Sequence, residues 1–144
     1  MTLLLEKEER RRLWQTLTAT IEKYFEEVGG LPVAPPTDIG EIRARLAACD
    51  FRRTAEPVEA LDFAARNLYE FQVHTPHPRY FELFNPAPAA MSVAADALGA
   101  AFNPQIAAWS HSPFAAAVGR HLIGAFGARF GFAPGNKLRR SPVA

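Results

Sequence analysis

Residues 76–113, PHPRYFELFNPAPAAMSVAADALGAAFNPQIAAWSHSP, decide how this chain is organised. They hold six of its twelve prolines. Each proline fixes φ and removes a backbone donor, so the backbone here is divided into defined extended segments and turns. Aromatic side chains stand between the prolines: Tyr80, Phe81, Phe84, Phe102 and Trp109. Such rings can line a ligand pocket or pack on the core of their own domain, and the residues alone leave both interpretations open.

Upstream of this stretch, apolar residues recur at steps of three and four, which is typical of helices with one apolar face. This spacing predicts three helices, at about residues 5–28, 38–49 and 57–72. The pair Gly29-Gly30 is expected to end the first helix in a left-handed turn. Asp38, with Glu41 three residues later, is typical of a capping box at the start of the second helix. Pro57 takes the favoured first position of the third.

Two more helices are expected within and after the stretch, at about residues 91–102 and 113–130. The first of these is rich in alanine and glycine, so we expect another helix to pack closely against it. Ser112 is expected to cap the second, and Gly131 to end it. No segment alternates with period two, although residues 79–84 could form a short extended piece. The predicted fold class is therefore all-α, with about five helices and a proline-rich aromatic loop.

Length and composition predict one helical segment over residues 1–135, followed by a basic and disordered tail at 136–144. The formal net charge is +1, which gives no reason to expect a nucleic-acid partner. The single Cys49 excludes an internal disulfide and fits a reducing compartment. No run approaches the ~20 apolar residues of a membrane span, and the charges at the start follow the apolar residues, unlike a secretory signal. We therefore expect a cytoplasmic protein without a membrane partner.

The four histidines are the first candidates for chemistry. His74 and His77 flank Pro76, but no third ligand follows at metal spacing, so no metal site is expected. His121 lies on the apolar stripe of the last expected helix and is expected to be a hydrogen-bonded core residue. His111 could contact the first turn of that helix or face a pocket, and the sequence does not decide which. No nucleophile, phosphate loop or acid–base pair appears, so no catalytic residue is predicted.

Two motifs carry a family resemblance: HPRYFELFNPAP at 77–88 and, after an alanine-rich helix, FNPQIAAWSHSP at 102–113. Together they resemble the amino-terminal region of the pyridoxal-phosphate-dependent decarboxylases of the aromatic-amino-acid and glutamate type (group II). The resemblance covers about residues 50–135 and, loosely, the first helix. It implies an intertwined, dimer-forming segment, because the first helices of these enzymes wrap over the other subunit.

The resemblance also implies substrate-pocket residues. In these decarboxylases an aromatic-x-Pro loop forms one wall of the pocket, and Phe84, Asn85 and Pro86 match it here. A register shifted by one residue would bring in Leu83. Trp109 and His111, in the second motif, match a segment that contributes near the active site from the neighbouring subunit.

The resemblance ends after residues 130–135, where these enzymes continue into a glycine- and serine-rich turn that binds the cofactor phosphate. This sequence reads NKLRRSPVA there. The Schiff-base lysine also belongs to the part that has no match. Pyridoxal phosphate is therefore expected in the complete enzyme but not in this chain alone, which is expected to be inactive. The expected partners are a second copy, a second chain carrying the cofactor domain, or both. The alternative is a non-catalytic helical dimerisation module derived from that family.

Overall fold

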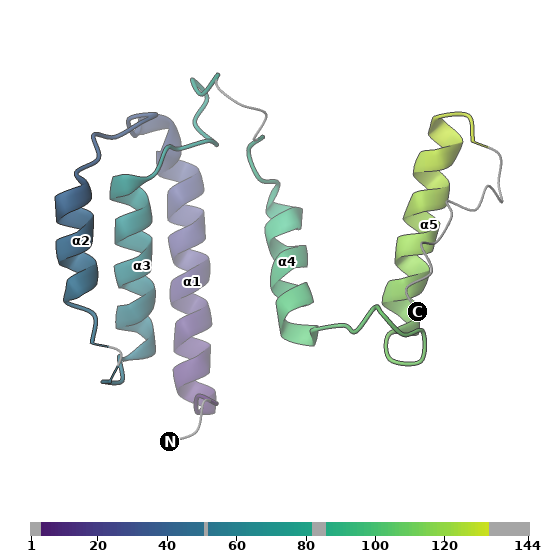
Figure 1. The fold of residues 1–144 in the computed structure, drawn as a ribbon, viewed down its shortest axis with the longest axis horizontal. Helices are drawn as coiled ribbons and strands as arrows, with labels where there is room; N and C mark the ends of the chain where they lie inside the picture. The colour runs from purple at the N-terminus through teal and green to yellow at the C-terminus, as the bar shows by residue number, and fades with distance from the viewer. Residues whose placement is uncertain (1–3, 51, 82–85, 133–144) are drawn as a thin grey trace. The chain divides into compact units, whose positions relative to one another are not determined.

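The structure is a computed structural model that describes residues 4–50, 52–81 and 86–132. Within these ranges it contains five α-helices, one 3-10 turn and no strand, which confirms the all-α prediction (Figure 1). The elements are α1 (Lys7–Glu27), η1 (Val28–Gly30), α2 (Ile39–Ala47), α3 (Pro57–Phe71), α4 (Ala90–Phe102) and α5 (Pro113–Arg129). Helix boundaries fall within about two residues of the predicted ones, as expected where helix ends fray.

The chain divides into two units, Met1–Pro88 and Ala89–Ala144. In the first unit, α1 lies beside α3, and α2 lies on the other side of α3 (Figure 1). The core of this unit is small: among the described residues the buried side chains are Val28, Val58, His74 and His77. Two of these four are histidines, so the interior of the first unit is unusually polar and depends on hydrogen bonds.

The two ends of α1 are closed by different local structures. At its start, Glu6 and Glu9 form a reciprocal capping box, in which the Glu6 backbone N–H donates to Glu9 Oε2 at 3.1 Å. At its end, the predicted left-handed turn at Gly29-Gly30 is wrong, because these glycines continue into the 3-10 turn η1. In this turn the Leu31 N–H donates to the Val28 carbonyl at 3.2 Å, in the i→i+3 pattern. A carbonyl at the end of the helix thereby gains a partner without a left-handed cap.

Polar contacts attach α2 to α3. Asp38 caps α2 as predicted, since its Oδ1 accepts from the Gly40 N–H at 2.7 Å. Glu41 does not complete a capping box but pairs with Arg45, one turn along the same helix. The Arg45 guanidinium also binds Glu70 on α3 at 2.6 Å and lies 4.6 Å from the centroid of the Phe71 ring. This single side chain therefore joins the two helices by charge and by stacking.

The ends of α4 and α5 follow the sequence more closely. Asn103 ends α4 in the left-handed region, with φ of 42°, and Gly131 ends α5 with φ of 78°. Ser112 takes the predicted N-cap position, but its side chain makes no capping bond. Its carbonyl accepts from the Ala116 N–H at 3.0 Å, so the backbone alone starts the helix.

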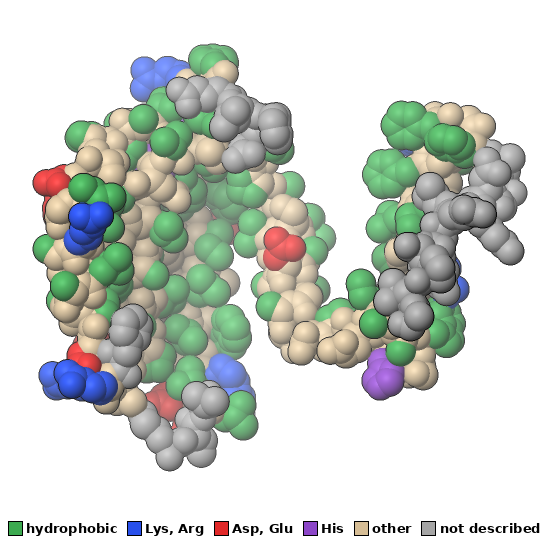
Figure 2. Space-filling model, viewed as in Figure 1, with side chains coloured by type: hydrophobic (Ala, Val, Ile, Leu, Met, Phe, Trp, Pro, Cys, Tyr) green, Lys and Arg blue, Asp and Glu red, His purple; other side chains and the backbone are tan. Residues whose placement is uncertain are grey.

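No described residue of α4 or α5 is buried. The expectation that α4 is a packed helix is therefore wrong for this chain, and so is the expectation that His121 is a core residue, since it is exposed. Alanine content and an apolar stripe show which face could be covered, but they do not supply the surface that covers it. Figure 2 shows hydrophobic side chains along both helices. The large exposed ones are Met91, Leu98, Phe102, Phe114, Val118, Leu122, Ile123 and Phe126.

Within the described ranges, no helix is both long and apolar enough to cross a bilayer. The same ranges contain no group of three or more His, Cys, Asp or Glu side chains that could hold a metal ion.

Candidate functional site

The predicted pocket residues fall in three places. Phe84 and Asn85, together with the alternative Leu83, lie outside the described residues. Pro86 is described, is exposed and belongs to the first unit. Trp109 and His111 are described and exposed in the second unit. Each group is therefore described in its own surroundings.

His74 lies at the base of the proline-rich segment and is fully buried. Its backbone N–H donates to the Val33 carbonyl at 2.8 Å, and its Nε2 lies 3.2 Å from the Tyr69 carbonyl oxygen. A carbonyl can only accept, so Nε2 must carry the hydrogen. In the neutral ring Nδ1 is then an acceptor, and the Tyr24 hydroxyl donates to it at 3.0 Å. The His74 imidazole thus ties α1 to the end of α3, and the backbone N–H of the same residue holds the segment after η1.

Tyr24 and Tyr69 surround this imidazole with aromatic edges. Their ring centroids are 5.3 Å apart at an angle of 76°, a T-shaped contact. Burial raises the pKa of Tyr24, while a weak hydrogen bond from Gln72 acts in the opposite direction. Burial also raises the pKa of Tyr69, helped by the negative charge of Glu27. Both phenols are therefore held in the protonated form, which Tyr24 needs in order to donate to His74.

His77 continues the same arrangement three residues later and is 3 % exposed. Its N–H donates to the His74 carbonyl, its Nδ1 accepts from the Arg79 N–H, and its carbonyl accepts from the Tyr80 N–H, each at 2.9 Å. Its Nε2 and the Tyr69 hydroxyl are buried and find no partner among the described residues. We call Tyr24, Tyr69, His74 and His77 the histidine base.

The histidine base fixes the backbone of residues 74–80 where the chain leaves α3 and leads toward the predicted pocket wall. From the sequence alone, His74 and His77 were expected to belong to a structural loop and not to a metal site, and no particular role was assigned to either. A signal was available: Tyr69 lies on the inward face of α3 only five residues before His74, so its ring and carbonyl were near enough to form a buried polar cluster.

Trp109 and His111 lie on a turn just before α5. The His111 N–H donates to the Ala108 carbonyl at 3.1 Å, and the Ser110 hydroxyl lies 3.2 Å from His111 Nδ1. The Trp109 side chain is 54 % exposed. The guanidinium carbon of Arg120 lies 4.3 Å from the centroid of its ring. No motif singles out Arg120, which is one of two arginines on a largely apolar helix, the other being Arg129.

The comparison with known proteins supports a relationship to a decarboxylase. The chain is 32% identical over 117 residues to a tyrosine decarboxylase of rice, Oryza sativa subsp. japonica. The match covers 78% of this chain but 22% of the rice protein, so the chain spans about a fifth of that relative. No family model matches the chain, and no solved structure matches it.

Proposed function

We propose that this chain is the amino-terminal part of a pyridoxal-phosphate-dependent amino-acid decarboxylase, where it supplies the dimer interface and one wall of the substrate pocket. The similarity to the rice tyrosine decarboxylase carries the proposal. The two proline-aromatic motifs, at 77–88 and 102–113, add to it because they lie at a consistent spacing.

The exposed apolar surface of α4 and α5 supports the interface role. Phe102 is 80 % exposed, Phe114 81 % and Phe126 63 %. Each large apolar side chain gains about 1.5–3 kcal/mol when it moves from water into an apolar contact. Soluble proteins that expose several such groups on neighbouring elements use them for association. In this proposal a second copy and the cofactor-carrying part of the enzyme cover these helices.

The histidine base supports the pocket role. A pocket wall must be held in one conformation, and a segment that begins on a fully buried, hydrogen-bonded histidine is well held at that end. Phe84, Asn85 and Pro86 form the wall that follows, with Trp109 and His111 contributed from the second motif. Tyrosine, tryptophan and glutamate remain equal candidates for the substrate, because the selective contacts are shared with residues beyond this sequence.

The described residues do not fit a pyridoxal phosphate site of their own. A lysine that forms a Schiff base works in a desolvated position or beside another cation. Lys7 and Lys23 instead lie on the exposed surface of α1, and Lys23 is 4.0 Å from Glu27. The cofactor and its lysine therefore belong to the remainder of the enzyme in this proposal.

A chimera tests the proposal directly. The segment of the rice tyrosine decarboxylase that matches this chain would be replaced by residues 1–135, and carbon dioxide release would be measured with tyrosine, tryptophan and glutamate. We expect the chimera to dimerise, to bind pyridoxal phosphate and to decarboxylate at least one of them. The rice protein without the segment serves as the negative control. A chimera that dimerises and binds the cofactor but decarboxylates none of them would contradict the proposal.

That same outcome would favour the second candidate function, a non-catalytic helical dimerisation module. The observation in its favour is that α4 and α5 expose apolar side chains along their length. A dimerisation module needs such a surface and needs no pocket. The module interpretation predicts dimers of the isolated chain and no contribution to turnover in any chimera.

A further inference from the structure

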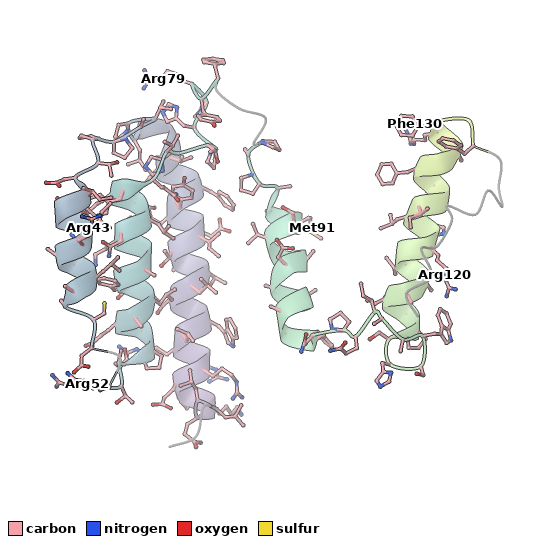
Figure 3. All side chains as sticks on the ribbon, viewed as in Figure 1. Arg43, Arg52, Arg79, Met91, Arg120 and Phe130 are labelled. Atoms are coloured by element: carbon pink, nitrogen blue, oxygen red, sulfur yellow. The ribbon has the colours of Figure 1, made fainter. Side chains whose placement is uncertain are left out.

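Arg120 contacts Trp109, one of the two described aromatic residues of the second motif. It lies on α5, where it is labelled in Figure 3, seven residues after the first position of that helix. Its guanidinium carbon is 4.3 Å from the Trp109 ring centroid, within the range of a stacked cation–π contact.

The helix geometry explains how the two residues meet. Seven residues correspond to about 10 Å along an α-helix. Side chains on a helix tilt toward its amino terminus, so a long arginine two turns into α5 extends back over the turn that precedes the helix. Trp109 lies on that turn, four residues before Pro113.

The charge of Arg120 is otherwise uncompensated. In residues 89–132, the described part of the second unit, the one acidic residue is Asp96, and Arg120 has no ion pair there. The indole face is thus the contact that the structure gives to this guanidinium. Trp109 is half-exposed, so few other side chains restrain its ring. The contact with Arg120 therefore contributes to holding the indole in one orientation.

We infer that Arg120 is a positioning residue, which fixes the indole of Trp109 in the orientation that the substrate pocket requires. The inference rests on the proposed function for the pocket role of Trp109, but not for the contact itself. Guanidinium stacking at exposed sites is weak. Its loss is therefore expected to lower the ratio of stacked to unstacked Trp109 by about two- to fivefold.

The contact can be tested in the full chain without any partner. The chain has two tryptophans, so the substitution Trp14→Phe leaves Trp109 as the sole fluorophore. In this background, Arg120→Ala is expected to increase acrylamide quenching of Trp109, and Arg120→Lys to restore the wild-type value only in part, because an ammonium does not stack as a plane. Arg129→Ala, which removes an exposed arginine from the same helix, is the matched control. If Arg120→Ala and Arg129→Ala give the same quenching, the positioning role is wrong.

The functional consequence is tested in the active chimera. Arg120→Ala is expected to raise KM about two- to fivefold with kcat retained, because a smaller fraction of the enzyme is competent to bind. A merely structural role would lower the yield or stability and leave KM unchanged. If Trp109→Ala raises KM and Arg120→Ala does not, the inference fails and the proposed function stands. If neither substitution changes KM, the pocket role of Trp109 fails and the inference fails with it. If the chimera dimerises and binds the cofactor but is inactive, the proposed function fails and the quenching result alone decides the contact.

Discussion

The substitution Tyr24→Phe tests whether the histidine base holds the first unit together. It removes the hydroxyl that donates to His74 Nδ1 at 3.0 Å and leaves the ring in its T-shaped contact with Tyr69. His74 is fully buried, so water cannot replace the lost donor without opening the structure. The variant therefore isolates one buried hydrogen bond from the packing around it.

The size of the effect follows from the unpaired acceptor. Leaving a buried polar atom without its partner costs about 1–3 kcal/mol. The ring is retained, so no cavity cost is added. In a unit of this size each kcal/mol lowers Tm by about 4–8 °C. The weak bond from Gln72 to the same hydroxyl, 3.5 Å long, is lost as well and adds little.

Urea and thermal unfolding of the full chain measure this effect, and Tyr69→Phe is its matched control. The Tyr69 hydroxyl is buried without a partner in the described structure, so its removal is expected to be neutral or slightly stabilising. Amide exchange of His74, whose N–H donates to Val33, supplies a second measurement if the unfolding transition is broad. Equal losses for Tyr24→Phe and Tyr69→Phe would refute the account of the histidine base.

Three further predictions concern the whole chain. The pKa of Tyr24 and of Tyr69 is raised above 10.0, chiefly by burial, so the folded state holds these protons more tightly than the unfolded chain does. The stability that this contributes is complete below about pH 10 and is lost as the pH rises through the folded-state pKa values, so urea midpoints should fall as the pH is raised from about 9 to beyond 10. Arg45→Lys should loosen α2, because an ammonium cannot bind Glu70 and stack on Phe71 together; faster amide exchange across α2, with no change in α1, would show it. Sedimentation at micromolar concentration should find the chain associated through the apolar sides of α4 and α5, and a compact monomer would contradict this.

The helices could be predicted from the sequence because their signals are local. Apolar spacing, Asp38 as a cap, Pro57 at a first helical position and Gly131 after the last helix all act within a few residues of the backbone that they fix. Gly29-Gly30 was an exception, since two glycines permit a left-handed turn without requiring one.

The candidate site could be predicted only in part. The motifs pointed to residues 84–86 and to Trp109, but they gave no reason to connect Tyr24 with His74, which is fifty residues away in sequence. Arg120 was missed for a related reason, because its role depends on the direction in which a helix side chain extends rather than on a motif.

By itself, the sequence determined where the helices of this protein lie, where most of them begin and end, and which family its proline-aromatic stretch resembles. The helix positions and ends depend on interactions between neighbours along the chain, and the resemblance depends on two short motifs. Only the tertiary structure decided that His74 and His77 are buried, that the His74 imidazole carries its hydrogen on Nε2, and that the stripes of α4 and α5 stay exposed. Part of this depends on residues that are distant in sequence and adjacent in space: Tyr24 and Val33 bind His74 from fifty and forty-one positions away, and no local pattern encodes those contacts.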